Sequence, residues 1–598
     1  MRRAGWSSDT LDKVAAMVLE EATIDNFRTL VGQTIKLNRK MTFVVGENNL
    51  GKTNFLDFIG LLFGRTSIPE GDFRDPSKPI TSTFKMRLTQ DEIGLLGDVC
   101  DIGDPFTVTV KMTADTPDSD MEFMHAESGE PIPGKLIRRF NVFRYSSTSS
   151  DASNLNFGKE RGVGKVLARG LSIYQQRHGK TTADFLNVEE FSDLMKYLND
   201  TFGSLPILGD YGMHVSIDET DADALGSAIT LADGNDLHFR RVGSGVQYVA
   251  MLLLSIVEGM IKMGERRLAE AIVENDDGKR SFSCIISLDE PEAHLHPYMQ
   301  RRLVKALSSV SEGEDEAFNA LLKDFFGVDK FAAQIVIATH SPNILRKSHE
   351  EIVRLFESEA GGVEVANGVD VALDFSAGKH FVDRFEFVRE AFFVKSVLIV
   401  EGPSEASALP RMAETMGIDV DDFGLLVLQV GGQGSISPAC KLLKAFKIEC
   451  MSVEDRDDGS AVLAGDSITT ERRDFEEEIV DALLDNDRLD IFLDVLEQYG
   501  QDPKKLVVQK GSLNKYAKKI GFDEFGVDVK LSDLLVEGKM QKSAESKALM
   551  YTWLSKEKSG VLGAVVGGLL PIECIPLCYQ SAIKASACIK EPVSGGRS

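Results

Sequence analysis

The stretch MTFVVGENNLGKTNFLDFIGLLFG (residues 41–64) joins an apolar strand, a glycine-containing loop and an apolar helix. The loop (residues 46–53) fits the pattern GxxxxGKS/T, in which backbone amides and the start of the helix face phosphate groups. We therefore expect Lys52 to bind the β- and γ-phosphates of ATP and Thr53 to bind its Mg²⁺ ion. The flanking strand and helix favour this interpretation over a chance match. The loop residues expected beside the phosphates are Gly46, Asn48, Asn49 and Gly51.

Two further apolar strands end in polar residues that suit nucleotide hydrolysis. CIISLDEPEAHLHP (residues 284–297) ends its strand in Asp289, which suits Mg²⁺, and Glu290, which suits a base that polarises the attacking water. FAAQIVIATHSP (residues 331–342) places His340 just after its strand, where it would sense the γ-phosphate. Alone, an acidic pair can be a helix cap and a single histidine is more often structural. Their order after the phosphate loop favours an ATPase.

A third loop precedes a long helix with apolar periodicity (residues 246–273). In RRVGSGVQ (residues 240–247), Ser244 and the flanking glycines are placed to contact the γ-phosphate of ATP on a second subunit. Gly-Ser-Gly is also an ordinary loop sequence, so this pattern alone leaves both interpretations open. Residues 161–206 have a helical pattern and predict an inserted helical region.

A second α/β unit begins at SVLIVEGPSE (residues 396–405), an apolar strand that ends in Glu401, with Glu405 one helical turn later. After the glycine-rich turn QVGGQGSI, another strand, IECMSVEDRDDG (residues 448–459), ends in Asp455 and Asp457. Carboxylates at the carboxyl ends of parallel strands converge on one crevice, where they repel each other unless cations are present. Mg²⁺ or Mn²⁺ fits such oxygen ligands, and two metals could flank a scissile phosphate. The simpler alternative is that these acidic residues cap helices.

The length and the net charge of the chain restrict the classes of function. The chain of 598 residues is long enough for two to four domains, and its net charge of −26 repels nucleic acid except at a local basic surface or a bound cation. One candidate surface is KKLVVQKGSLNKYAKKIG (residues 504–521), with six lysines and no acidic residue, although a solvated helix face explains it equally well. A smaller candidate consists of Arg138, Arg139 and Arg144.

Cysteine usage and hydropathy bear on location. Seven scattered cysteines without a CxxC pair fit neither a zinc module nor a disulfide framework, and we expect a reducing cytoplasm. The N-terminus lacks the apolar segment of a signal peptide. The most apolar stretch (residues 560–579) is interrupted by Pro571 and Glu573, so we expect a buried segment and no membrane role.

This set of motifs resembles ABC-type ATPase heads of the SMC and RecF kind. It consists of the phosphate loop, the loop with Ser244, the strand that ends in Asp289 and the strand that is followed by His340. The order of Glu401, the glycine-rich turn and the pair Asp455 and Asp457 resembles a Toprim domain. Their union in one chain, over about residues 20–555, resembles the OLD (overcoming lysogenization defect) family of nucleases, which includes the nuclease subunit of the Gabija anti-phage system. The long coiled coil of SMC heads is missing.

This resemblance implies an α/β fold in two parts. The first is an ABC-type P-loop ATPase domain (residues 17–385) with an inserted helical region (about residues 150–230) that could serve dimerisation. The second is a Toprim nuclease domain with a helical C-terminal part (residues 390–598). Because two ABC-type heads sandwich ATP, the resemblance implies a homo-oligomer, at least a dimer. It also implies DNA as the substrate, and it allows a helicase or another defence-system subunit as a partner.

For the Toprim part, the resemblance implies a two-metal DNA endonuclease controlled by ATP. Its expected ligands for Mg²⁺ or Mn²⁺ are Glu401, Glu405, Asp455, Asp457 and Glu476, and a further ion would sit with ATP at Thr53 and Asp289. Lys542 is our candidate for the lysine that steadies the transition state, in preference to Lys539 and Lys547. Glu454 departs from the family pattern, where a small or hydroxyl residue is usual, and either crowds the metal site or points away.

Two other classes of protein remain as alternatives. Topoisomerases and primases also contain Toprim domains, but the ten tyrosines show no DNA-gate setting and the cysteine spacing shows no zinc module. The other alternative is an ATP-gated DNA-binding sensor or scaffold with an inactive Toprim domain. A test of metal-dependent DNA cleavage separates it from a nuclease.

Overall fold

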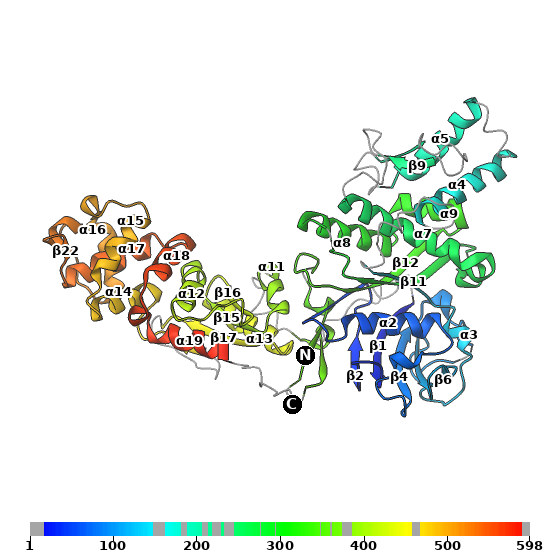
Figure 1. Cartoon of the computed structure of the whole chain (residues 1–598), viewed down its shortest axis with the longest axis horizontal. Coiled ribbons are helices and arrows are strands. Elements are labelled where there is room, and N and C mark those ends of the chain that lie inside the picture. The colour runs from blue at the N-terminus through cyan, green and yellow to red at the C-terminus, as the bar shows by residue number, and fades with distance from the viewer. Residues whose placement is uncertain are drawn as a thin grey trace. The chain divides into compact units, whose positions relative to one another are not determined.

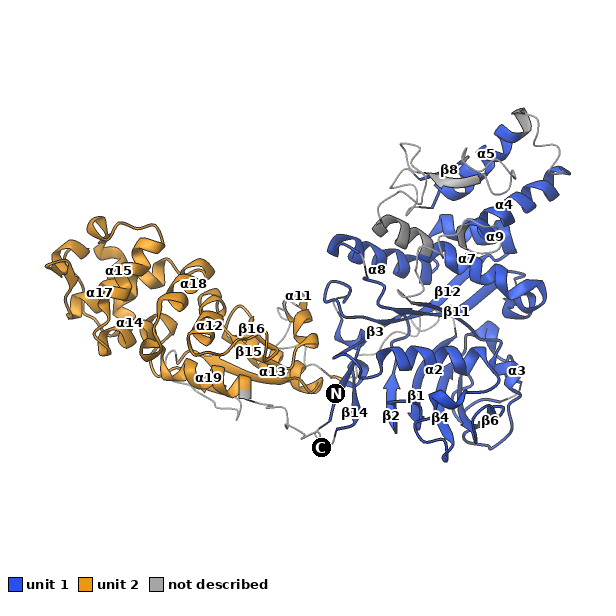
Figure 2. Ribbon diagram, in the orientation of Figure 1, with its two compact units in different colours: residues 1–370 blue, residues 371–598 orange. Residues whose placement is uncertain are grey.

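The computed structural model describes residues 17–97, 99–146, 162–180, 188–205, 213–217, 229–232, 244–275, 277–293, 295–346, 348–358, 361–372, 385–456 and 467–588. Residues 1–370 and residues 371–598 form two compact units (Figure 2). Each contains its own sheets and its own apolar core.

A seven-stranded sheet forms the centre of the first unit (Figure 1). Its order is β10-β11-β12-β3-β13-β14, and β7 also pairs with β11. Strands β7, β11, β12, β3 and β13 are mutually parallel, so their carboxyl ends meet at one edge. The strands are β3 (Met41–Gly46), β7 (Asn141–Ser146), β10 (Ile272–Glu274), β11 (Arg280–Asp289), β12 (Lys330–Ala338), β13 (Ile352–Glu357) and β14 (Val363–Asn367). Almost every residue of β3 and β12 is buried, as expected for parallel strands covered on both faces.

A second, antiparallel sheet lies across helix α2 (Lys52–Gly64) from the first (Figure 1). Its strands, in the order β2-β1-β4-β5-β6, are β1 (Val18–Asp25), β2 (Gln33–Lys36), β4 (Ile80–Arg87), β5 (Thr107–Ala114) and β6 (Glu122–His125). Strands β4 and β5 pair antiparallel along their whole length, from Ile80 with Ala114 to Arg87 with Thr107. Aromatic contacts fix α2 against this sheet: the rings of Phe63 and Phe84 are 5.9 Å apart.

The remainder of the first unit is mainly helical. Its helices are α3 (Gly134–Ile137), α4 (Gly162–His178), α5 (Val188–Gly203), α7 (Ser244–Ala271), α8 (Pro297–Ser311) and α9 (Glu316–Phe326). Helix α7 bends at Gly264, whose φ is 76°. The inserted region, expected to be helical, also contains an antiparallel hairpin of β8 (His214–Ile217) and β9 (Ile229–Ala232). The β-branched residues in HVSI and ITLA favour strands there.

The second unit contains a parallel four-stranded sheet in the order β16-β15-β17-β18 (Figure 1). These strands are β15 (Ser396–Val400), β16 (Leu425–Gln429), β17 (Glu449–Glu454) and β18 (Ser467–Thr469). Its larger helices are α12 (Pro403–Thr415), α13 (Ile436–Ala445), α14 (Phe475–Asp485), α15 (Leu489–Gln498), α17 (Ala544–Lys556), α18 (Gly560–Leu569) and α19 (Leu577–Cys588). Shorter elements are α11 (Phe385–Val388), α16 (Lys510–Tyr516), β19 (Val507–Val508), β20 (Val529–Lys530), β21 (Leu535–Val536) and β22 (Lys539–Met540).

Part of the apolar stretch at residues 560–579 lies in the core of this unit, while Val561, Ile572 and Leu577 are exposed. Helix α18 packs on α12, and Gly563 and Gly567 face it. A Cβ atom at Gly563 would overlap the carbonyl oxygen of Ser404, and one at Gly567 would overlap that of Ala408. The glycines therefore permit a close approach of two helices. Within the described ranges, no helix is long and apolar enough to cross a bilayer.

Candidate functional site

The phosphate loop of the first unit runs from the end of β3 to the start of α2. Gly46 has a φ of 136° and Gly51 a φ of 97°, a region that glycine adopts without strain. A Cβ atom at Gly46 would overlap the Leu355 carbonyl oxygen, so the close approach of β13 also requires glycine there. Asn49 has a positive φ of 64°, and it and Asn48 are exposed at the tip of the loop. The predicted strand, loop and helix are therefore present.

Lys52 lies at the centre of this loop and is 6% exposed. Its ammonium donates hydrogen bonds to the carbonyl oxygens of Gly46 (2.9 Å) and Glu47 (2.7 Å). Burial lowers the pKa of Lys52 to about 8, although the nearby Glu290 and Asp289 raise it. An anionic phosphate beside this ammonium would favour its charged form.

Asp289, at the end of β11, faces the start of α2. The Thr53 hydroxyl donates a hydrogen bond of 3.1 Å to Asp289 Oδ1. Nη2 of Arg144 lies 3.4 Å from Asp289 Oδ2 and 2.7 Å from Asp57 Oδ1. Burial raises the pKa of Asp289, and the Arg144 charge opposes this rise. The structure thus brings Thr53 and Asp289 together, and it places Arg144 at this site rather than with Arg138 and Arg139.

The two residues proposed to act on the γ-phosphate are adjacent. Glu290 has a φ of 49°, and its Oε1 lies 3.5 Å from Nε2 of His340. Burial and the Lys52 charge lower the pKa of His340. Glu292, which sequence analysis overlooked, holds this loop: its Oε1 accepts hydrogen bonds from the Thr339 hydroxyl (2.8 Å) and the His340 amide (2.6 Å). In the sequence, Glu292 could have been noticed because it lies two residues after Glu290.

Ser244 begins helix α7, as the loop-to-helix pattern predicts. Its side chain lies outside the described part of the chain, as do the preceding residues 241–243.

In the second unit, candidate metal ligands meet at the carboxyl edge of the parallel sheet. Glu401 follows β15, and its backbone carbonyl accepts hydrogen bonds of 3.1 Å from both Gly431 and Gly432. The glycine-rich turn therefore wraps the end of β15. Asp455 follows β17, and its amide donates a hydrogen bond of 3.2 Å to Oε1 of Glu401. The neighbouring parallel strands β15 and β17 thus bring the two acidic residues together.

Glu405 enters the same site from the first turn of α12. Its Oε2 accepts a hydrogen bond of 2.9 Å from the amide of Gly402, so it partly caps its own helix. The other oxygen, Oε1, is buried without a partner. The helix-cap alternative therefore accounts for one oxygen of this carboxylate and leaves the other oxygen free for a ligand.

Three carboxylates in the described part of this unit each have one buried oxygen that forms no hydrogen bond: Glu405 Oε1, Asp455 Oδ1 and Glu476 Oε1. Burial raises the pKa of Asp455 to about 9, and the charges of Glu405 and Glu401 add to this effect. Burial likewise raises the pKa of Glu405 to about 7, and it raises the pKa of Glu476. Unpaired, mutually repelling buried carboxylates are costly for a folded protein. Their oxygens are the ligand type that Mg²⁺ and Mn²⁺ prefer, so these residues fit divalent cations.

One lysine lies against this carboxylate cluster, and it was not the one chosen from sequence. Nζ of Lys558 is 3.1 Å from Oε2 of Glu476. Burial lowers the pKa of Lys558, but the charges of Glu476, Asp455 and Glu405 outweigh this and raise it. Lys558 lies two residues before α18, whose glycine face packs on the Glu405 helix, α12. In the sequence, Lys558 could have been noticed as a lysine at the start of a glycine-rich segment.

The lysines considered from sequence lie elsewhere. The Lys542 ammonium donates a hydrogen bond of 2.6 Å to the Leu484 carbonyl at the end of α14. Lys547 pairs with Glu477 (3.1 Å) and Asp481 (2.7 Å), and Lys539 is exposed in β22. The structure therefore corrects the choice of Lys542, because this side chain is held by a helix end rather than by the carboxylates.

Two other sequence-based expectations concern the end of β17. Asp457 lies outside the described residues. Glu454, the departure from the family pattern, accepts a hydrogen bond of 3.3 Å from the Ser452 hydroxyl. Ser452 and Glu454 are two residues apart on a strand and share one face, so Glu454 is turned toward Ser452 rather than toward Asp455.

The lysine-rich segment (residues 504–521) is at the surface of the second unit. All six of its lysines are exposed, and Lys505 pairs with Asp502 at 3.2 Å. Lys515 and Lys519 lie over the ring of Tyr516, at 4.8 Å and 5.6 Å from its centroid. The segment therefore presents cations and an aromatic side chain together.

Comparisons with known proteins match a different family model to each of the two units. Residues 392–457 match the family model "Overcoming lysogenization defect protein-like, TOPRIM domain", and residues 17–122 and 176–345 match "AAA ATPase domain". The chain is 22% identical to the Old nuclease of Escherichia phage P2 over 74% of this chain and 78% of that protein. It is 23% identical to the OLD nuclease of Thermus scotoductus over 74% of this chain and 82% of that protein.

Among solved structures, the SMC head domain from Thermotoga maritima matches with a TM-score of 0.29 and 13% identity, covering 59% of this chain and 99% of that one. The two family models fall on the two units, and the named relatives align across most of the chain. The sequence-based recognition is thereby confirmed: the chain is similar to the OLD nucleases, with an ATPase domain followed by a Toprim domain.

Proposed function

We propose that this protein is a metal-dependent DNA endonuclease whose cleavage or DNA engagement is controlled by ATP. The observation that carries the proposal is the cluster of three buried carboxylates, Glu405, Asp455 and Glu476, each with an unpartnered oxygen. A purely structural cluster would satisfy these oxygens with hydrogen bonds, since buried polar groups without partners are rare. We therefore assign the catalytic groups to this carboxylate cluster.

Each residue of the cluster has a definable part in hydrolysis. Glu401, Glu405, Asp455 and Glu476 would hold divalent cations, with Asp457 as a further ligand. Such ions, when bound, activate water and neutralise charge on a phosphodiester. The Lys558 ammonium, already 3.1 Å from Glu476, would place positive charge beside a non-bridging phosphate oxygen. The cluster also supplies attraction for DNA that the net charge of −26 does not.

The ATPase unit would act as the control element. Lys52 would bind the β- and γ-phosphates, while Thr53 and Asp289 would hold the Mg²⁺ ion of ATP. Glu290 would orient the attacking water and His340 would contact the γ-phosphate. We further propose a homodimer, in which Ser244 of one copy completes the ATP site of the other.

The biological setting is also part of the proposal. DNA cleavage gated by ATP suits anti-phage defence or DNA processing in a reducing, cytoplasmic environment. The described cysteines are all free, which is compatible with such a compartment. A helicase or another defence-system subunit is the class of partner we propose.

The test is cleavage of plasmid and linear DNA by the purified chain with Mg²⁺ or Mn²⁺, with and without ATP, beside Asp455→Ala. We expect cleavage that requires the metal and is lost in the variant, while ATP binding is unchanged because the phosphate loop is in the other unit. Glu454→Gln is a matched control, since this neighbouring carboxylate is turned toward Ser452. Metal-independent cleavage, or cleavage retained by Asp455→Ala, would refute the assignment. No cleavage by any form would favour the sensor or scaffold.

A further inference from the structure

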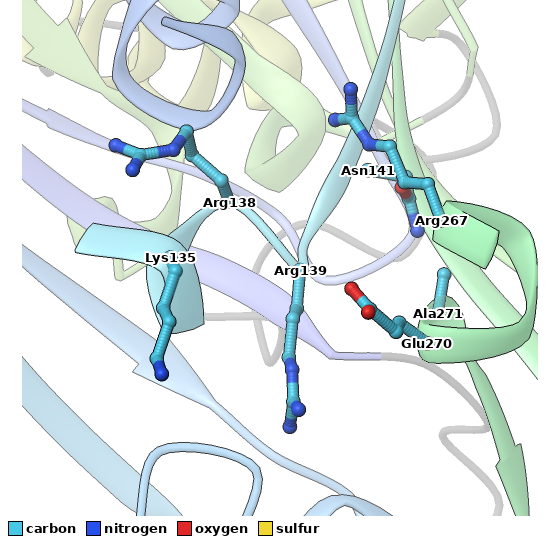
Figure 3. A pocket seen from close by; sticks show the side chains of 7 residues that line it. All are labelled: Lys135, Arg138, Arg139, Asn141, Arg267, Glu270 and Ala271. Carbon is cyan, nitrogen blue, oxygen red and sulfur yellow. The ribbon is translucent and has the colours of Figure 1, made fainter. Parts of the chain in front are cut away.

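A basic pocket opens in the first unit where α3 and the end of α7 face each other. It has a volume of about 250 Å³ and is lined by Lys135, Arg138, Arg139, Asn141, Arg267, Glu270 and Ala271. Figure 3 shows Lys135, Arg138 and Arg139 on the α3 side and Arg267, Glu270 and Ala271 on the α7 side. Four of the seven lining residues are cations, in a chain whose net charge is −26.

These cations are available to a ligand. Within the described part of the chain, none of the four takes part in an ion pair, whereas the single carboxylate of the pocket, Glu270, has its own partner in Arg266 at 3.3 Å. Asn141, at the start of β7, is 3% exposed and still contributes to the lining. The pocket thus combines four cations with an amide held in place by the sheet, both of which suit phosphate oxygens.

The lining also distinguishes between kinds of phosphate ligand. A nucleotide site normally includes an apolar or aromatic surface for the base, but the apolar contribution here is a single alanine, Ala271. The charged groups are spread over both sides of an open pocket, which a continuous backbone can cross. This composition favours phosphodiester groups of a nucleic-acid strand, recognised without regard to base sequence.

The position of the pocket is compatible with simultaneous binding of ATP. Asn141 pairs with Cys284 at the start of β7, whereas Ser146, at the other end of that strand, pairs with Asp289 of the nucleotide site. The two sites are therefore at opposite ends of β7, about 17 Å apart along a strand of this length. A polyanion in the pocket leaves the phosphate loop open.

We infer that this pocket, defined by Lys135, Arg138, Arg139, Asn141 and Arg267, is a DNA-backbone binding site on the ATPase unit. The inference rests on the proposed function for its choice of DNA as the polyanion. It adds a second contact surface, on a different unit from the residues proposed to carry out cleavage. DNA held at the ATPase unit would link substrate engagement to the unit that binds ATP.

The test uses the full chain and a short fluorescein-labelled DNA duplex, with EDTA present so that cleavage does not interfere. Arg138→Gln combined with Arg267→Gln removes one cation from each side of the pocket. We expect roughly tenfold weaker binding by anisotropy, and a slope of log affinity against log salt that is smaller by about two. Lys111→Gln combined with Lys330→Gln makes the same change of charge at exposed positions outside the pocket and should bind as the wild type does.

Unchanged affinity in the pocket variant, equal weakening in the control, or no binding by the wild type would each overturn the inference. Binding of inorganic phosphate tests whether the pocket takes a small ligand. If the pocket variant loses phosphate binding but still binds DNA as the wild type does, the pocket is a site for a free phosphate compound instead. Thermal unfolding verifies that the variant is folded. Plasmid cleavage by the wild type is measured separately, so a failed pocket and a failed nuclease assignment give different results.

Discussion

The ammonium of Lys558 lies 3.1 Å from Oε2 of Glu476, although the two residues are 82 positions apart in sequence. Glu476 is in the first turn of α14 and Lys558 precedes α18. The pair places a cation against buried carboxylates that retain unpartnered oxygens. This relationship identifies the lysine whose removal should matter most for cleavage.

Lys558→Met is expected to lower the rate of DNA cleavage by about 100-fold or more, because one preorganised charge beside the reacting phosphate is removed. The same substitution should strengthen Mn²⁺ binding, since the ammonium competes with cations for Glu476. Single-turnover kinetics and Mn²⁺ titration measure the two effects. Lys542→Met is the matched control and should cleave within a few-fold of wild type, because Lys542 bonds to a helix carbonyl. Equal losses in both variants would contradict the assignment.

Divalent cations should stabilise the second unit through its carboxylate cluster. We expect Mg²⁺ or Mn²⁺ to raise the unfolding temperature of the wild type, and Asp455→Asn to remove that rise. In EDTA the variant should be more stable than the wild type by about 1–3 kcal/mol, because folding no longer requires Asp455 either to take up a proton or to bury a charge without a partner for Oδ1. Differential scanning calorimetry measures both. A metal-induced rise that persists in Asp455→Asn would place the ions elsewhere.

Nucleotide binding should depend on Lys52 alone among nearby lysines. Lys52→Ala removes a buried ammonium that already bonds to two loop carbonyls, and it should abolish measurable ATP binding by calorimetric titration. Lys40→Ala, at an exposed residue that pairs with Glu312, should leave ATP affinity unchanged. If Lys52→Ala binds ATP normally, the phosphate-loop assignment is wrong.

The contact between α12 and α18 should be sensitive to single methyl groups. Gly563→Ala introduces a Cβ atom against the Ser404 carbonyl, and we expect it to lower the free energy of unfolding by about 1–3 kcal/mol. Cleavage should fall with it, because Glu405 is carried by α12 and Lys558 precedes α18. Gly568→Ala, in the same helix but with open space around it, should be neutral or stabilising by about 0.5–1 kcal/mol. Denaturant unfolding compares them, and equal behaviour would refute this packing.

Glu351 should make the stability of the first unit depend on pH. Burial raises its pKa from 4.5 to about 7, although Arg346 opposes the shift from 3.5 Å. The native state therefore binds more protons than the unfolded chain between these values, and its stability falls as pH rises from about 4.5 to 7. Glu351→Gln should recover about 2 kcal/mol at pH 8 and little at pH 4. The exposed neighbour Glu350→Gln is the control, and a pH-independent effect of Glu351→Gln would contradict the expectation.

Local patterns were sufficient to locate the elements and most of the candidate groups. The phosphate loop lies between a strand and a helix, Asp289 ends a buried strand and His340 follows another, as the sequence indicates. The hairpin at β8 and β9 was overlooked because helical periodicity dominated the surrounding insertion. Arg144 was grouped with Arg138 and Arg139 by proximity in sequence, but on β7 its side chain reaches Asp57 and Asp289.

The sequence by itself determined the order of the motifs, because each depends on a few neighbouring residues: glycines that permit positive φ, apolar runs that form buried strands, and acidic residues at strand ends. Only the tertiary structure decided which distant side chains meet. Lys542 and Lys558 are both lysines beside helices in the same region, and the packing of α18 on α12 through Gly563 and Gly567 selects Lys558. Such a choice is made by close contact between helices, which sequence spacing does not encode.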